Sequence, residues 1–106
     1  MGQTNTDLRL THEMFKNDAL IYETKGLNSF SIRSEKSPHS VTLSYNNMPY
    51  VGFWTTYPVE SPFLCIEPWV GIADTLETSG ELHEKTGIQC LAANEQFETK
   101  YSITVK

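Results

Sequence analysis

Cysteine is scarce in this sequence, in which only Cys65 and Cys90 occur among 106 residues. Two cysteines are too few to form a small disulfide scaffold, so the fold must rely on an ordinary hydrophobic core. A chain of this length is one domain at most, because single domains usually contain roughly 100–200 residues. We therefore expect a single domain over residues 1–106 in a reducing environment.

Basic residues are also few. The 8 Lys and Arg residues stand against 13 Asp and Glu residues, which gives a formal net charge of −5 at pH 7. The basic residues are scattered along the chain, whereas neutralisation of nucleic-acid phosphates requires clusters of them. The charge pattern therefore argues against nucleic acid as a partner.

Long apolar runs are absent as well. No window approaches the roughly 18 uninterrupted apolar residues of a membrane-spanning helix. Residues 1–5, MGQTN, have neither the basic start nor the apolar stretch of a secretion signal. The sequence thus predicts no membrane partner and a cytoplasmic location.

Metal and cofactor motifs are missing too. His12, His39 and His83 lie far apart in sequence, and with the two cysteines they show no zinc-site spacing. The acidic residues between positions 74 and 84 lack the ligand pattern and the central glycine of a calcium loop. There is no glycine-rich phosphate loop and no nucleophile elbow. We expect no metal and no cofactor.

What the sequence does contain is alternation of apolar and polar residues, which predicts β-strands. The segments that read as strands are 19–22, 29–33, 41–46, 50–54, 63–66, 97–105 and, more weakly, 87–91. Residues 29–46 are predicted to form a hairpin with one solvent-exposed face. A single helical turn is predicted after Thr11. Together these segments predict an all-β fold, an antiparallel sandwich-type domain. The loops at 55–61 and 68–86 are where function is expected.

Glu67 is the single residue that most strongly suggests a functional role. It ends the apolar segment 63–66, so if Phe63, Cys65 and Glu67 share a face, a carboxylate lies at the edge of a buried surface. Pro68 is then expected to stop the strand. A carboxylate in such a place is suited to act as a general base. The alternative is a glutamate at a strand end that only reaches solvent.

Aromatic residues surround this carboxylate in sequence, foremost Trp54 and Trp69. An aromatic face beside a carboxylate is typical of a sugar site, because the apolar face of a pyranose stacks on a ring while its hydroxyls form hydrogen bonds. Simple core packing of the two tryptophans is the alternative.

Residues 62–74, PFLCIEPWVGIAD, resemble the C-terminal part of the aldose 1-epimerase (galactose mutarotase) family, in the bacterial branch related to lactose-operon mutarotase-like proteins. Further matches in the same order are residues 15–21, 49–54, 80–88, and 95–97 with 101–103. The resemblance covers nearly the whole chain.

This resemblance implies an isomerase of carbohydrate metabolism that interconverts the α and β anomers of a free aldose, such as a hexose, without a cofactor. Glu67 matches the family's general base, and Asp18 matches an aspartate that contacts the sugar. Trp54 and Trp69 would complete the substrate-binding face. The implied fold is the C-terminal part of a galactose mutarotase-like β-supersandwich.

The chain departs from the family in its length. Family members are much longer, and their general-acid histidine and a substrate-binding arginine and histidine lie in an N-terminal part with no counterpart here. We therefore expect a truncated form whose activity on its own is in question. The alternatives are a non-catalytic carbohydrate-binding module and an inactive truncated homologue. A half-sandwich would expose a sheet face and edge strands, so a homo-oligomer is also expected.

Overall fold

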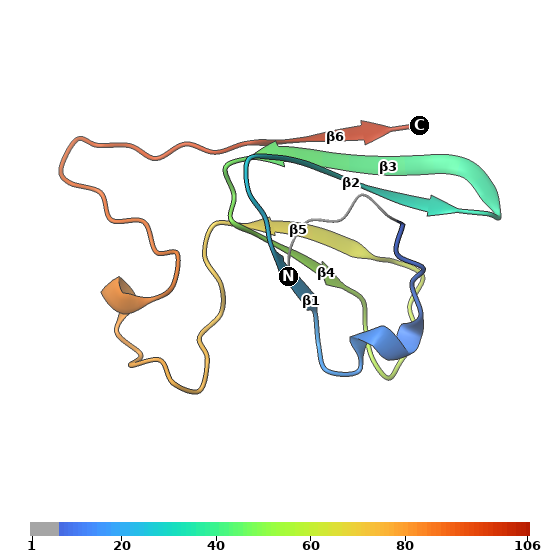
Figure 1. Ribbon diagram of the computed structural model, residues 1–106, viewed down its shortest axis with the longest axis horizontal. Coiled ribbons are helices and arrows are strands. Elements are labelled where there is room, and N and C mark those ends of the chain that lie inside the picture. The colour runs from blue at the N-terminus through green and yellow to red at the C-terminus, as the bar shows by residue number, and fades with distance from the viewer. Residues whose placement is uncertain (1–6) are drawn as a thin grey trace.

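The computed structural model describes residues 7–106 and contains two three-stranded antiparallel sheets (Figure 1). Residues 1–6, where no secretion signal is expected, lie outside the described part. The strands are β1 (Leu20–Glu23), β2 (Leu27–Ser34), β3 (Ser37–Asn46), β4 (Tyr50–Trp54), β5 (Cys65–Trp69) and β6 (Tyr101–Val105). Two short 3-10 helices are η1 (His12–Phe15) and η2 (Leu82–Glu84). The prediction of an all-β antiparallel sandwich is confirmed.

The two sheets have the strand orders β1-β4-β5 and β2-β3-β6. Their facing sides meet in a core centred on Val51, which is fully buried, and on Leu43 and Tyr45. The rings of Phe30 and Phe53 meet between the sheets in an edge-on contact, with centroids 5.3 Å apart. This packing fixes which face of each sheet points outward.

The hairpin of β2 and β3 forms as predicted, with a polar outer face. Hydroxyl groups pair across the strands, Ser29 with Ser44 at 3.1 Å and Ser31 with Thr42 at 2.7 Å. The connection is tighter than expected, because β3 already begins at Ser37. Pro38 is tolerated near the start of β3 because β6 pairs with that strand only from Ser40 onward.

Three strand predictions need correction. Residues 87–91 form no strand, because this segment lies in the long excursion between β5 and β6 and has no strand beside it to pair with. The alternation over 97–105 produces a strand only from Tyr101, where β3 offers a partner. Pro68 does not stop β5; it pairs with Val51, and β5 is an edge strand where a missing N–H is tolerated.

The excursion between β5 and β6 protrudes from the two sheets, at the left in Figure 1. Within this excursion, the backbone of residues 70–71 lies against the backbone of residues 86–87. A Cβ on Gly87 would lie 2.5 Å from the carbonyl oxygen of Val70, and Gly87 has a φ of +80°. Only glycine fits this crossing, because the backbone approach is close and φ is positive.

The apolar face of β6 is left uncovered. Tyr101, Ile103 and Val105 lie on the same face of their sheet as Leu43, yet they are 58%, 58% and 74% exposed. Strand β6 also has a free edge, since it ends its sheet. Over the described residues, no helix has the length and apolar character that crossing a membrane requires.

Candidate functional site

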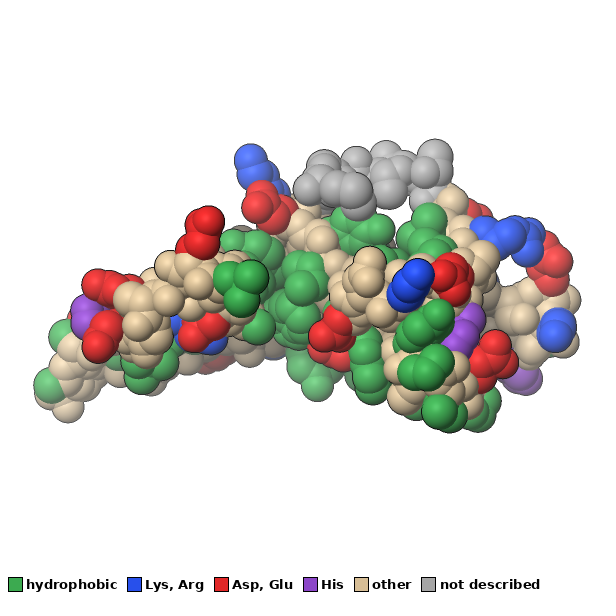
Figure 2. Space-filling view, turned by 90° about the horizontal axis from the view of Figure 1, so that it is seen from below, with side chains coloured by type: hydrophobic (Ala, Val, Ile, Leu, Met, Phe, Trp, Pro, Cys, Tyr) green, Lys and Arg blue, Asp and Glu red, His purple; other side chains and the backbone are tan. Residues whose placement is uncertain are grey.

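Three of the four residues singled out from the sequence, Glu67, Trp54 and Trp69, lie on one side of the β1-β4-β5 sheet. We call this the outer face, because it points away from the β2-β3-β6 sheet. Strand alternation and register assign to it Ile21, Glu23, Tyr50, Gly52, Trp54, Cys65, Glu67 and Trp69. Figure 2 shows hydrophobic side chains gathered near the middle of the molecule as seen from below. The outer face therefore combines a carboxylate with aromatic rings.

Glu67 lies in the middle of β5, directly opposite Gly52 of β4. The Trp69 indole covers Gly52, and a Cβ added there would lie 2.8 Å from Cζ2 of that ring. The absence of a side chain at position 52 thus allows the indole to lie over the sheet beside Glu67. Glu67 itself is half-buried, not a strand-end residue.

Trp54 lies on the other side of Glu67 along the sheet, opposite Cys65. Its ring contacts that of Phe63, with centroids 5.8 Å apart. Both tryptophans are half-buried on the outer face, whereas the buried hydrophobic core consists of Phe15, Leu43, Tyr45, Met48 and Val51. The two indoles are therefore available at the surface on either side of the carboxylate.

Cys65 lies on the same face of β5 as Glu67, as the alternation predicted. Burial raises the pKa of the Cys65 thiol, and the charge of Glu67 and a side-chain hydrogen bond with it raise that pKa further. The thiol therefore stays protonated at neutral pH and donates to the carboxylate instead of acting as a nucleophile. The spacing of two residues along a strand indicated the shared face, but not the effect of Glu67 on the thiol.

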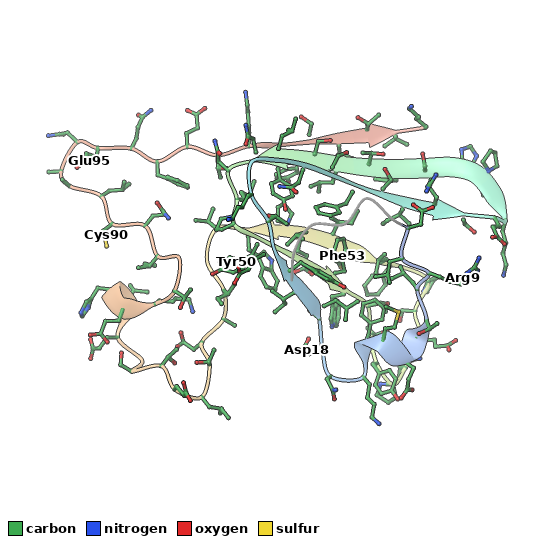
Figure 3. All side chains as sticks on the ribbon, in the orientation of Figure 1. Arg9, Asp18, Tyr50, Phe53, Cys90 and Glu95 are labelled. Carbon is green, nitrogen blue, oxygen red and sulfur yellow. The ribbon has the colours of Figure 1, made fainter. Side chains whose placement is uncertain are left out.

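Asp18 does not join this group. It lies in the turn before β1, which β4 separates from β5, and Figure 3 labels it in this loop. Its φ is +84°, and its Oδ1 accepts a hydrogen bond of 2.7 Å from the backbone N–H of Ala19. The structure thus gives Asp18 a local capping role and shows no contact with Glu67.

The histidines lie elsewhere. His39 is 3.3 Å from the carbonyl oxygen of Lys106, His83 lies beside Glu84, and His12 lies next to the loop after β4. Across residues 7–106, no group of three or more His, Cys, Asp or Glu side chains is placed to hold a metal ion. The outer face can offer a base, a thiol donor and stacking surfaces.

Comparison with known proteins then gives a distant relationship. The chain is 26% identical over 103 residues to the proteins named "Protein LacX, plasmid" and "Protein LacX, chromosomal" of Lactococcus lactis subsp. lactis. This chain is similar to LacX. The aligned region covers 97% of this chain but 34% of each LacX protein, so the chain spans about a third of the length of these relatives.

No family model matches the chain, and no solved structure matches it. The similarity to LacX extends along almost the whole chain. Membership in the aldose 1-epimerase family remains a prediction from the motif around Glu67.

Proposed function

We propose that this chain is the base-bearing part of an aldose 1-epimerase-like protein that acts in the cytoplasm on a free hexose. The observation that carries the proposal is the position of Glu67 on the outer face, between Trp54 and Trp69 and opposite Gly52. The similarity to the LacX proteins supports a role in carbohydrate metabolism.

The outer face suits a pyranose in two ways. An indole offers a flat apolar surface for the C–H face of the sugar, and a carboxylate accepts hydrogen bonds from its hydroxyls. Because Gly52 has no side chain, the Trp69 indole can lie over the centre of this face, next to Glu67. The Cys65 thiol lies two residues from Glu67 on the same face and can donate to the carboxylate.

In the proposed reaction, Glu67 takes the proton of the anomeric hydroxyl. The C1–O5 bond breaks as the carbonyl forms at C1, and the ring oxygen receives a proton. Rotation about C1–C2 presents the other face of the carbonyl, and the reverse steps close the ring as the other anomer. The outer face supplies the base; the proton for the ring oxygen comes from water or from a residue outside this chain.

Polarimetry of freshly dissolved α-galactose tests this proposal. The chain is expected to speed the approach to anomeric equilibrium above the buffer rate, and Glu67→Gln is expected to abolish that increase. Glu23→Gln is the matched control, because Glu23 is an exposed carboxylate on the same face. A wild-type rate equal to that of buffer would refute catalysis by this chain.

A non-catalytic carbohydrate-binding module is the second candidate, favoured by the accessible indoles of Trp54 and Trp69. Saturable sugar binding that quenches tryptophan fluorescence, without faster anomer exchange, would select it. Asp18 is part of the proposal as a sugar contact. If it binds sugar, Asp18→Asn should weaken binding without changing the fold, and an unchanged affinity would remove it.

A further inference from the structure

Strand β6 ends its sheet, and all five of its residues are exposed. Beside it, the N–H of Lys106 donates to the carbonyl oxygen of Ser40 at 2.9 Å, and the N–H of Ser40 donates to the carbonyl oxygen of Lys106 at 3.0 Å. Because successive residues of an antiparallel strand direct their backbone groups to opposite sides, the odd-numbered residues of β6 direct theirs away from β3. The free edge therefore presents the N–H and C=O groups of Tyr101, Ile103 and Val105.

The other edges of the two sheets carry features that hinder further pairing. Strand β2 has a register shift after Arg33, and Arg33 forms an ion pair with Asp7 at 2.7 Å. Pro68 in β5 lacks an N–H, and β1 carries the charged Glu23. Bulges, charges and prolines are the usual means by which edge strands avoid association. Strand β6 contains no charge, no proline and no register shift, so it is the edge suited to accept another strand.

The segment before β6 continues the alternation of that strand without a partner. Residues 97–100 keep the two-residue period, with Phe97 in step with the apolar residues of β6 and Glu98 in step with the polar ones. Figure 1 shows this segment approaching β6 in line with the strand. The pairing of β3 with β6 ends at Tyr45 and Tyr101, so β3 does not reach it. A strand added at the free edge can pair with this segment and with β6 as one continuous strand.

The charges beside β6 fit a second copy of the same strand, antiparallel and related by a two-fold axis. The registers that keep most of β6 paired place the axis at residue 101, 102 or 103. An axis at residue 103 sets Lys100 directly opposite Lys106 of the second copy, which is unfavourable. An axis at Ser102 instead sets Glu98 opposite Lys106 at both ends, and opposite charges directly across a strand pair are stabilising. The charges therefore select the axis at Ser102.

We propose that two copies of this chain join through β6 in this register and form one continuous sheet with the strand order β2-β3-β6-β6-β3-β2. The exposed Tyr101 ring then lies beside the exposed Ile103 of the second copy, so the two apolar rows cover part of each other. The β2 edges, with their charge and register shift, end the joined sheet on both sides. Assembly therefore stops at a closed dimer whose two copies use the same surface.

Sedimentation equilibrium of the full chain measures the dimer Kd and tests the role of the charges. We expect a monomer–dimer equilibrium without larger species. Lys106→Glu sets two carboxylates opposite each other at both ends of the interface and is expected to raise the Kd about tenfold. Combining it with Glu98→Lys restores opposite charges and should return the Kd to within about threefold of the wild type. Lys16→Glu is the matched control, since Lys16 is exposed beside η1 and undergoes the same change in charge.

Disulfide cross-linking tests the register. In a Cys65→Ser, Cys90→Ser background, Ser102→Cys places two thiols across the two-fold axis. The Cα atoms of such a pair are about 4.5 Å apart, which a disulfide can span. Thr104→Cys is the matched control on the same face of β6, because the two copies of residue 104 would be separated by about 13 Å along the strands. Mild oxidation is expected to yield a covalent dimer with Ser102→Cys and not with Thr104→Cys.

Three results would overturn the proposal. The first is a wild-type chain that sediments only as a monomer or as an open-ended series of larger species. The second is a dimer whose Kd responds to Lys106→Glu no more than to Lys16→Glu, which would place the interface elsewhere. The third is equal cross-linking of the two cysteine variants, which would exclude the axis at Ser102. None of these measurements involves sugar, so the dimer can fail or hold whether or not Glu67 catalyses anomer exchange.

Discussion

Replacing Gly52 with alanine is expected to displace the Trp69 indole from the outer face. The added Cβ would lie 2.8 Å from Cζ2 and 3.0 Å from Cη2 of that ring, distances at which the indole must shift. Overpacking of this kind typically costs about 1–3 kcal/mol. Alanine in a strand is otherwise better than glycine by about 0.5–1 kcal/mol, because glycine loses more backbone entropy on folding. The net expectation is a loss of roughly 0–2.5 kcal/mol.

The sign of this effect should reverse when the ring is removed. In a Trp69→Leu background the two ring atoms that meet the new Cβ are absent, so Gly52→Ala should stabilise the chain by about 0.5–1 kcal/mol. The four proteins form a double-mutant cycle with an expected coupling of about 1–3 kcal/mol. Position 52 has no positive φ, so alanine fits its backbone without strain.

Urea unfolding followed by far-UV circular dichroism measures the cycle, and tryptophan fluorescence reports the ring displacement in the folded state. Sugar binding to the outer face should weaken in Gly52→Ala, since the indole would no longer lie beside Glu67. Additive stabilities for the two substitutions, within about 0.3–0.5 kcal/mol, would refute the packing of Trp69 over Gly52.

Three further predictions concern the framework around the site. Gly87→Ala should destabilise the chain by about 1–3 kcal/mol, because it combines a φ of +80° with a backbone clash at 2.5 Å; Gly80→Ala, with φ +84° and open space, is the control in urea unfolding and should cost less. Burial raises the pKa of the Tyr45 hydroxyl, although its hydrogen bond with Thr24 opposes this shift. The contribution of Tyr45 to stability is therefore complete below the ordinary pKa of 10.0. It is lost as the pH rises through the pKa of the folded state. Tyr45→Phe should cost about 1 kcal/mol at neutral pH and flatten the alkaline loss measured by unfolding at several pH values; an equally steep loss in the variant would contradict this. The uncharged free edge and apolar face of β6 predict self-association, which Ile103→Lys should reduce in sedimentation velocity; a wild-type chain that sediments only as a monomer would count against it.

The strands whose two faces differ were predictable from the sequence. Alternation around Phe30 and Leu43 identifies β2 and β3, because one side of that sheet faces solvent and the other forms the core. The same alternation between residues 97 and 100 has no partner strand, so it gives no β structure there. Alternation in the sequence indicates which side chains a strand would bury, but the strand forms only where another strand lies beside it to pair with.

The candidate site was predictable in part, for a similar reason. Glu67, Trp54 and Trp69 were identified as residue types, and their common face depends on β5 continuing through Pro68. That continuation depends on the edge position of β5, which no local pattern reveals. Gly52 owes its role to a contact across the fold, with Trp69, so the sequence alone did not indicate it.

Glu67 is proposed to act as the base in anomer exchange. Two-dimensional exchange NMR on galactose labelled with 13C at C1 measures that exchange at equilibrium. We expect exchange peaks that grow with protein concentration for the wild type and for Glu23→Gln, and a rate at least about 10²-fold lower for Glu67→Gln. Equal exchange rates for the wild type and Glu67→Gln would contradict it.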